Sequence, residues 1–226
     1  VTGTNGKTTT VKLIYEILKD QMGDKVALAG NVGIPFIEVI SKKSNYDYIV
    51  LEVSSFQLET IIDFKPVIGI ILNITEDHLD RYKSMQEYAE AKANIFKNQN
   101  ENDFIILNYE DKFTPILSGM AKSNKILFSA YRELNDGYYF KNGIFYKNVF
   151  GKKEEMLDAN EIKLKGNHNY ENVLSSLIVS DILKLDFEKT KNTVKNFKGL
   201  PHRIEFVAEI NGKKYYDDSK GTNIDA

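Results

Sequence analysis

The chain has 226 residues, and its 30 basic and 32 acidic side chains leave a formal net charge of −2. A hydrophobic content of 42% supplies enough apolar side chains for a folded core, which excludes a disordered chain. The lack of cysteine excludes disulfides, zinc ribbons and thiol nucleophiles. The balanced charge argues against nucleic acid as a partner, and no apolar run approaches the roughly 20 residues that span a membrane. With no visible signal peptide, a cytoplasmic location is expected.

Both ends of the chain look like interrupted patterns. Val1 and Thr2 stand directly before a glycine-rich loop, which predicts the stub of a strand whose earlier residues are missing. At the other end, the run 217–223 stops in mid-pattern. We therefore expect the sequence to be an excised part of a longer chain.

Strand-like and helix-like segments alternate along most of the chain. Apolar residues at helical spacing predict helices over 7–22, 85–97, 168–183 and 189–197. Short apolar runs predict strands over 26–29, 48–53, 67–74, 104–107 and 126–128. The nearly unbroken apolar run over 48–53 is typical of a parallel strand covered on both faces. The alternation predicts an α/β fold, with a mainly parallel sheet flanked by helices.

A boundary is predicted at Lys198–Pro201, where the alternation breaks. We expect one domain over 1–198 and the start of a second, truncated one over 199–226. Asn-Gly pairs at 142–143 and 211–212 each lie between strand-like segments, as in type I′ hairpins. The terminal hairpin is too short to build a core of its own.

The run Gly3-Thr4-Asn5-Gly6-Lys7-Thr8-Thr9 lies between the strand stub and the first helix, where a phosphate loop would lie. Glycines let backbone N–H groups close on an anion, Lys7 would reach the β- and γ-phosphates, and Thr8 would ligate Mg²⁺. The usual motif has glycine five positions before Gly6, where this chain has Val1. A plain glycine-rich turn with a solvated lysine is therefore the alternative.

Polar side chains follow two of the predicted strands. Glu52 ends the strand over 48–53, where a carboxylate that orients Mg²⁺ would lie, although a rim carboxylate paired with a lysine would look the same. Ser54 offers a hydroxyl at the same edge. The polar run 75–82 contains His78, which is either a metal ligand through its neutral imidazole or part of a helix start.

Lys92 falls on the apolar stripe of the helix predicted over 85–97. Such a lysine either extends its ammonium outward to water or holds it near the sheet edge. Burial would lower its pKa, and a neutral amine can react with CO₂ to give a carbamate, whose two oxygens could bind Mg²⁺. From the residues alone, the outward orientation is the simpler interpretation.

Two further groups of polar residues are candidates for nucleotide contacts. Asn169 and Asn172 lie at i and i+3 on one helix face, where two amides can bind a flat heterocycle or simply cap the helix. His202-Arg203 and Asp218-Ser219-Lys220 carry mixed charge that would either meet a nucleotide or lie on the surface.

Taken together, these segments resemble the Mur ligase family. The resemblance rests on the loop 2–9 and on four later runs, in family order: 52–59, 73–82, 199–203 and 218–223. It implies ATP-dependent amide formation, in which a substrate carboxylate attacks the γ-phosphate and the resulting acyl phosphate is attacked by an amine. The runs 52–59 and 73–82 are most similar to the branch that adds D-glutamate to UDP-N-acetylmuramoyl-L-alanine in peptidoglycan precursor synthesis.

The resemblance also implies roles for single residues. The loop Gly3–Thr9 would hold the ATP phosphates, Thr8 and Glu52 one Mg²⁺, and His78 and a carbamylated Lys92 a second. Further contacts are implied with the muramoyl substrate by Asn31 and Ser54, with adenine by Asn169 and Asn172, with phosphate by Arg203, with ribose by Asp218, and with the reacting groups by Lys220 and Thr222.

Two alternatives to the D-glutamate ligase remain. One is a related amide ligase of the folylpolyglutamate type, against which the runs 54–57 and 202–203 count. The other is an ATP-binding module that is inactive as an isolated fragment, because the chain resembles only the central domain and the beginning of the third. In either case the expected partners are small molecules.

Overall fold

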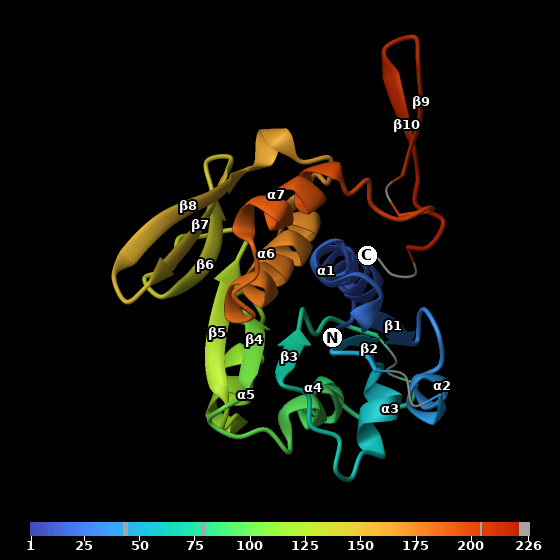
Figure 1. Cartoon of the computed structure of the whole chain (residues 1–226), viewed down its shortest axis with the longest axis vertical. Coiled ribbons are helices and arrows are strands. Elements are labelled where there is room, and N and C mark those ends of the chain that lie inside the picture. Colours follow the sequence, from blue (N-terminus) through green and yellow to red (C-terminus); the bar gives the residue numbers. More distant parts are fainter. Residues whose placement is uncertain (43–44, 78–79, 204, 222–226) are drawn as a thin grey trace.

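A computed structural model describes residues 1–42, 45–77, 80–203 and 205–221. Strands lie side by side through the middle of the molecule, helices cover both of their faces, and one hairpin projects away (Figure 1). Among the described residues, every helix is too short or too polar to cross a bilayer.

The strands form two parallel groups and an antiparallel extension. β1 (Val26–Gly30) pairs in parallel with β2 (Tyr48–Glu52). In the second group β3 (Ile68–Ile71), β4 (Phe104–Asn108), β5 (Asn124–Ser129) and β6 (Gly137–Lys141) are parallel neighbours in that order. β7 (Ile144–Val149) and β8 (Lys152–Asp158) continue the sheet as an antiparallel meander. The mainly parallel sheet predicted from the sequence is confirmed.

Residues 1 and 2 join the two parallel groups into one surface. The Val1 nitrogen donates to the Leu51 carbonyl at 2.8 Å, and the Val53 N–H donates back to the Val1 carbonyl at 3.0 Å. On the other side, Thr2 exchanges backbone hydrogen bonds with β3, donating to Ile70 and accepting from Leu72. The two residues therefore occupy the strand position between β2 and β3, as the predicted strand stub requires.

Helices cover the sheet on both faces. On one face lie α1 (Lys7–Met22), α6 (Asn167–Ile182) and α7 (Phe187–Asn196). On the other lie α3 (Ser55–Glu59), α4 (Met85–Ala93) and α5 (Thr114–Met120). The short α2 (Phe36–Ser41) packs beside β1, and single 3₁₀ turns occupy Gly23–Lys25, Asn94–Phe96 and Ala159–Glu161.

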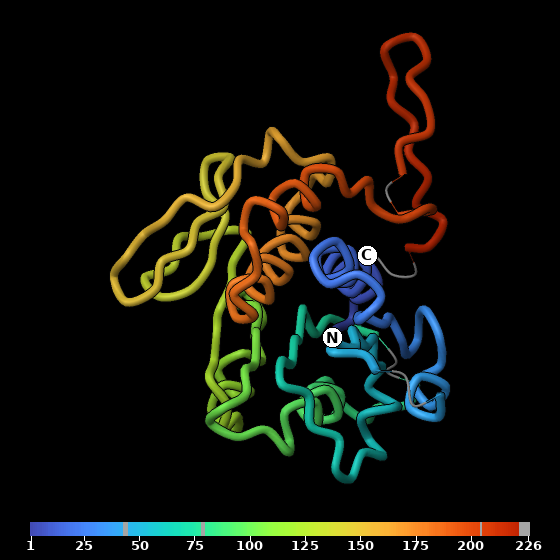
Figure 2. The backbone as a smooth tube through the Cα atoms, viewed as in Figure 1, coloured from blue at the N-terminus to red at the C-terminus, as the bar shows by residue number. Residues whose placement is uncertain are grey.

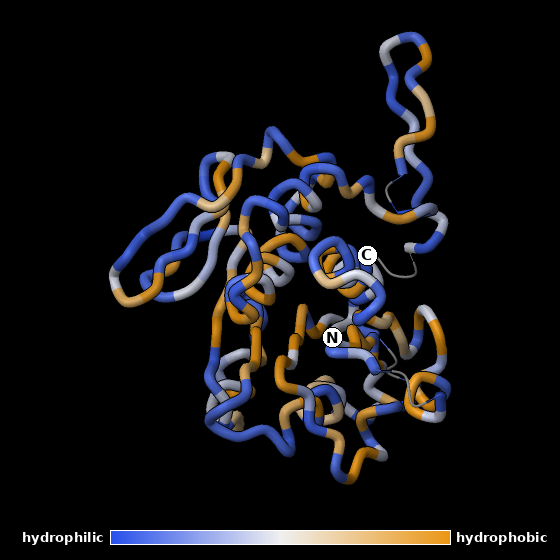
Figure 3. Tube along the Cα trace, in the orientation of Figure 1, coloured by the Kyte–Doolittle hydropathy of each residue, from blue (hydrophilic) through white to orange (hydrophobic). Residues whose placement is uncertain are grey.

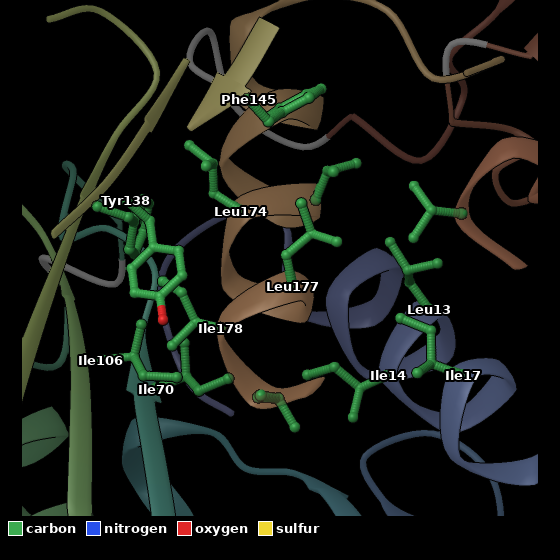
Figure 4. Close-up of a cluster of buried hydrophobic side chains, with 14 of the residues drawn as sticks. Leu13, Ile14, Ile17, Ile70, Ile106, Tyr138, Phe145, Leu174, Leu177 and Ile178 are labelled. Atoms are coloured by element: carbon green, nitrogen blue, oxygen red, sulfur yellow. The ribbon is translucent and has the colours of Figure 1, made fainter. Parts of the chain in front are cut away.

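The larger core lies between the sheet and the first group of helices. Leu174, Leu177 and Ile178 of α6 are fully buried, with strand residues on one side and α1 residues such as Leu13 on the other (Figure 4). Each such aliphatic side chain stabilises the fold by about 1.5–3 kcal/mol relative to an exposed one. The apolar residues accordingly gather toward the strands and the buried faces of the helices (Figure 3). The core fixes α1 and α6 against each other, which places both helix N-termini beside the loop 3–8.

The last described element is the hairpin of β9 (Glu205–Ile210) and β10 (Lys213–Asp217), which projects from the rest of the chain (Figure 2). Asn211 and Gly212 at its tip both have positive φ, 53° and 73°, as a type I′ turn requires. The other predicted Asn-Gly turn, at 142–143, also has positive φ at both residues and joins β6 to β7. Both hairpins predicted from sequence are confirmed.

The structure departs from the predicted elements in several places, and it adds the short helices α2, α3 and α5, which were not predicted. The strand predicted over 67–74 covers only Ile68–Ile71, and the rest of that run bends toward the loop. Ile49 of β2 is 40% exposed, so the expected burial of both faces fails there. Strand β8 was not predicted, because its first four residues are charged and exposed and leave no alternating apolar pattern.

Candidate active site

The loop from Gly3 to Thr8 is fastened to the segment that follows β3. The Asn5 N–H donates to Asn73 Oδ1 at 2.8 Å, and Asn73 Nδ2 donates back to the Asn5 carbonyl at 3.2 Å. The Thr4 hydroxyl donates to the Thr75 carbonyl and accepts from the Thr75 N–H. Gly6 has φ 81°, a left-handed backbone, and is the N-cap of α1. The loop therefore stands at the carboxyl edge of the sheet with a helix N-terminus behind it, which is an anion-binding arrangement.

Lys7 folds back over this loop. Its Nζ donates to the carbonyls of Gly3 at 3.0 Å and Thr4 at 2.7 Å, although Lys7 itself begins α1. Burial lowers the pKa of Lys7, and the nearby Glu52 carboxylate opposes that shift. The alternative of a solvated lysine on a plain turn is therefore wrong.

Lys92 reaches the same carbonyl oxygen from α4 on the opposite face of the sheet. It is only 2% exposed, its Nζ donates to the Gly3 carbonyl at 2.9 Å, and the ammonium lies 4.3 Å from the centre of the Tyr88 ring. Burial, followed by repulsion from Lys7, lowers the pKa of Lys92 to about 7. The outward orientation that the sequence favoured is wrong, because the apolar stripe of α4 faces the core beneath the loop.

Glu52 ends β2 and is 4% exposed, and its Oε2 is buried without a hydrogen-bond partner among the described residues. Within the described part of the chain, Glu52 makes no ion pair with a lysine. The alternative of a rim carboxylate paired with a lysine is therefore wrong. A buried carboxylate oxygen without a hydrogen-bond partner is costly unless a cation neutralises it. Together with the Thr8 hydroxyl it offers hard oxygen donors, which is the ligand type that Mg²⁺ prefers. The residues present therefore fit a magnesium ion.

Four residues predicted to contact the nucleotide line one small pocket of about 60 Å³ with the loop residues Asn5, Gly6 and Thr9. They come from two distant parts of the chain: Asn169, Asn172, Arg203 and Asp218. Arg203 Nη2 donates to the Thr8 hydroxyl at 3.4 Å. The sequence-distant segments thus converge on the loop.

The two asparagines do not cap α6. Its N-cap is Gly166, and Asn169 Nδ2 donates to the Lys165 carbonyl at 2.9 Å. Asn172 is buried, and its Oδ1 accepts from the Thr10 hydroxyl at 3.0 Å. A Cβ added to Gly6 would lie 2.4 Å from that same Oδ1, so α6 and the loop are in close contact. The capping alternative is wrong.

A larger pocket of about 400 Å³ opens on the other side of Asn5 and Gly6, toward the ends of β3 and β4. Among its lining residues, Glu171 is 8% exposed and accepts from Asn108 Nδ2 at 2.9 Å. Burial raises the pKa of Glu171 to about 7, with repulsion from Glu110 and Asp111 adding to the shift. This carboxyl group is therefore partly neutral at neutral pH.

The profile of the Mur ligase middle domain matches residues 1–180. This chain belongs to the Mur ligase family. Relatives named UDP-N-acetylmuramoylalanine--D-glutamate ligase are 48% identical in Thermoanaerobacter sp. (strain X514) and 47% in Caldicellulosiruptor bescii, each over 100% of this chain. The chain spans about half the length of these curated relatives, 50% in both cases.

Solved Mur ligase structures share the fold. MurF from Acinetobacter baumannii superposes with a TM-score of 0.73 at 18% identity, covering 96% of this chain and 49% of its own. MurF from Thermotoga maritima, described in complex with ADP, superposes with a TM-score of 0.67 at 20% identity, covering 96% and 52%. At these identities the likeness concerns the fold alone.

The other residues for which the sequence predicted a role in the site either do not line these two pockets or lie outside the described part of the chain. Ser54 is the N-cap of α3 in a capping box with Gln57, and the Asn31 N–H donates to the Glu52 carbonyl at 3.1 Å. Lys220 is exposed, and its N–H donates to the His202 carbonyl. His78 and Thr222 lie outside the residues that the structure describes.

No role was predicted from the sequence for the residues that hold the loop 3–8 and cover Lys92. Asn73 and Thr75 hold the loop, and Tyr88 covers the Lys92 ammonium with its ring and contacts the Thr4 hydroxyl at 3.4 Å. Asn73 and Thr75 lie in the run 73–82 on which the resemblance rests, but that run does not mark their bonds to the loop. Tyr88 left a signal of its own, since it lies four residues before Lys92 on the same apolar stripe.

Proposed function

We propose that a ligase of the relatives' length that contains this chain, here called the full-length ligase, adds D-glutamate to UDP-N-acetylmuramoyl-L-alanine with hydrolysis of ATP to ADP. The observation that supports ATP chemistry best is the convergence of Lys7, Lys92 and Arg203 on the loop 3–8. The choice of D-glutamate follows from relatives of that name, which are 43–48% identical over nearly the whole chain.

ATP would lie with its phosphates on the loop. The backbone N–H groups of the loop and the N-terminus of α1 favour the negative charge, and Lys7 needs only to leave two carbonyls to reach a phosphate. Asn169 and Asn172 would contact adenine, Arg203 the phosphates and Asp218 the ribose. All four line the pocket that contains Thr9.

Two magnesium sites complete the proposed centre. Thr8 and Glu52 would hold one ion, and His78 with a carbamylated Lys92 the other. A pKa of about 7 leaves much of the Lys92 amine neutral, which carbamate formation requires. Bound magnesium would neutralise charge on the transferred phosphoryl group.

The proposed reaction has two steps. A carboxylate oxygen of UDP-N-acetylmuramoyl-L-alanine attacks the γ-phosphorus, the bond to the β-phosphate oxygen breaks, and an acyl phosphate and ADP form. The amine of D-glutamate then attacks the acyl carbon, loses a proton, and phosphate leaves. Lys7 would stabilise the negative charge in the first step. Asn31 and Ser54 would bind the muramoyl substrate, and Lys220 and Thr222 would lie near the reacting groups.

We assign residues 1–198 to the central ATP-binding domain and residues 199–226 to the start of the C-terminal ligase domain. Five apolar or aromatic residues of the projecting hairpin are at least half exposed: Phe206, Val207, Ile210, Tyr215 and Tyr216. Their exposure supports a hairpin that packs within a larger domain. Substrates that are nucleotides and free amino acids support a cytoplasmic location.

The test is product formation by the full-length ligase with D-glutamate, L-glutamate, L-lysine or folate acceptors. We expect ADP and phosphate release only with UDP-N-acetylmuramoyl-L-alanine and D-glutamate together. Lys7→Ala should lower the rate at least about a hundredfold, because a positioned cation at a phosphoryl-transfer centre contributes several kcal/mol. Equal rates with another amino acid would refute the substrate assignment, and near-normal turnover by a folded Lys7→Ala variant would refute the loop's role.

A further inference from the structure

We propose that His202 is a positioning residue of the nucleotide site, which holds Arg203 and Asp218 in place without touching the nucleotide itself. The inference rests on the proposed function, because it assumes that those two residues bind ATP. Arg203 directly follows His202, whereas Asp218 comes after the hairpin. The strand pairing places Glu205 opposite Asp217, so the two segments leave the hairpin side by side, and His202 adds side-chain and backbone bonds at that point.

His202 makes three hydrogen bonds across the base of the hairpin. Its N–H donates to Glu205 Oε2 at 2.8 Å, and its Nδ1 lies 2.6 Å from Asp217 Oδ2. Its carbonyl accepts from the Lys220 N–H at 3.1 Å. We call these four residues the His202 clasp. The clasp ties the entry to β9, the end of β10 and the turn that follows it.

The clasp aims Arg203 at the phosphate loop. His202 has φ 64°, a left-handed conformation that is uncommon outside glycine, although asparagine, aspartate and histidine adopt it more often than other residues. The Arg203 N–H closes a turn on the Leu200 carbonyl at 3.3 Å. The chain reverses here, and Arg203 Nη2 reaches the Thr8 hydroxyl. The three hydrogen bonds of His202 hold its left-handed backbone in place.

The same bonds hold Asp218. Asp217 accepts from His202 through Oδ2 and from the Ser219 N–H through Oδ1 at 2.9 Å, which fixes the turn on which Asp218 lies. These contacts lower the pKa of Asp217 to about 2, with the His202 hydrogen bond as the largest cause. Asp217 thus remains an ionised acceptor, and the residue next to it lines the pocket with Arg203.

Stability does not account for the clasp. The side chains of His202 and Asp217 are 54% and 31% exposed, and ion pairs this exposed add little to folding. His202, Glu205 and Asp217 also bring possible metal-ligand atoms within 4.8 Å of one another. However, His202 Nδ1 and Asp217 Oδ2 are directed at each other, 2.6 Å apart, so a positioning role explains the three side chains without a metal.

Steady-state kinetics of the full-length ligase test the proposal. His202→Asn keeps a residue that tolerates positive φ but removes the imidazole, and Asp217→Ala removes its acceptor. Because ATP contacts by Arg203 and Asp218 exist before and during phosphoryl transfer, both variants should raise the KM for ATP about tenfold and change kcat less than about twofold. Asp217→Asn, which retains an acceptor oxygen, should restore a KM within about threefold of the wild type.

Asp47→Ala is the matched control, since it breaks an exposed pair with Lys25, 3.2 Å apart, and both residues lie far in sequence from those that line the pocket. It should change neither constant. Unchanged KM in both clasp variants would overturn the proposal, as would a fall in kcat that accompanies a lowered melting temperature. Lack of turnover in the wild type would instead contradict the proposed function.

Discussion

The carbonyl oxygen of Gly3 accepts hydrogen bonds from two lysines that approach from opposite faces of the sheet. Lys7 does so at 3.0 Å and Lys92 at 2.9 Å. Two cations on one oxygen repel each other, and both pKa values are lowered, chiefly by burial. The neutral form of Lys92 is therefore populated at the pH of a cell, whereas an unperturbed lysine has a pKa near 10.4.

We expect Lys92→Ala to lower turnover of the full-length ligase at least about a hundredfold, because the proposed carbamate oxygens of the proposed second metal site would be lost. Added acetate or propionate should restore part of the rate by supplying oxygens to the space left by the side chain. Lys92→Glu should retain more activity than Lys92→Ala, since it carries a carboxylate at nearly the same reach. The rates are measured as ADP release at saturating substrates.

The added carboxylic acids distinguish the loss of the carbamate oxygens from the loss of side-chain packing at position 92. Lys92→Met fills the volume of the lysine stem without oxygens, so it serves as the control and should gain nothing from acetate. If either Lys92→Ala or Lys92→Met turned over as fast as the wild type, the carbamate hypothesis would be wrong.

Glu171 predicts a pH dependence of stability. Its folded pKa of about 7 lies above the unfolded value of 4.5, so the folded state binds more protons between these pH values. The stability from its neutral form is complete below pH 4.5 and is lost as pH rises through 7. Relative to Glu171→Gln, the wild-type free energy of unfolding should fall by roughly 2 kcal/mol between pH 5 and 8. Urea unfolding of both proteins at each pH measures this, and a constant difference would contradict it.

At the scale of elements, the site depends on how closely α6 approaches the phosphate loop. Asn172 meets both Gly6 and Thr10, the first turn of α1, while the core residues of α6 pack between α1 and the sheet. The packing of the two helices thus determines the position of an amide that would contact adenine.

Gly6→Ala should therefore cost more than the left-handed backbone alone explains. Gly143 is the matched control: its φ of 87° is close to the 81° of Gly6, but an added Cβ would meet nothing within 4 Å. We expect Gly143→Ala to lose about 1 kcal/mol of unfolding free energy and Gly6→Ala at least about 2 kcal/mol, with loss of nucleotide binding. Equal losses in urea unfolding would mean that the contact with Asn172 relaxes freely.

The sequence predicted most element positions, because their signals are local. Helix α1 matches the range predicted from its apolar spacing, and both Asn-Gly turns adopt the expected backbone. The run Ser84-Met85-Gln86-Glu87 also predicts a capping box; Ser84 does cap α4, but the reciprocal bond of Glu87 goes to the Lys83 N–H. The complete capping box is instead at Ser54 and Gln57. Choosing between such pairs requires the backbone geometry at each helix start.

The site was predictable where residue type and strand order suffice, as for Lys7 and Glu52 at the carboxyl edge of the sheet. The position of Lys92 was not, because an apolar stripe cannot say whether a lysine stem ends in water or beneath a loop from another element. Asn73 was likewise hidden, since its partner Asn5 is distant in sequence and pairs with it only after β3 lies beside residues 1–2.

At the scale of the whole molecule, the pocket proposed to bind the nucleotide is shared between the folded body and the projecting hairpin segment. Arg203 and Asp218 belong to that segment, whose side chains pack little against the rest. A segment that is held only at its base must be ordered when the ligand binds, and this cost lowers the affinity relative to a segment already held by a domain.

We therefore expect this 226-residue chain to bind ATP at least about tenfold more weakly than the full-length ligase. Isothermal titration calorimetry with a non-hydrolysable ATP analogue and Mg²⁺ measures both affinities. The Lys7→Ala form of the full-length ligase controls for non-specific binding. Equal affinities would show that the pocket residues of the chain suffice by themselves.

The two residues between β2 and β3 have a consequence for how the molecule opens. The amides of Val53 and Leu72, which directly follow β2 and β3, both donate to carbonyls of this short segment, at 3.0 and 3.1 Å. Among the described residues, the segment supplies the strand pairing between the two parallel groups. In hydrogen–deuterium exchange the two amides should thus lose protection together, in one opening event. A nucleotide on the adjoining loop would slow the exchange of both, although it contacts neither.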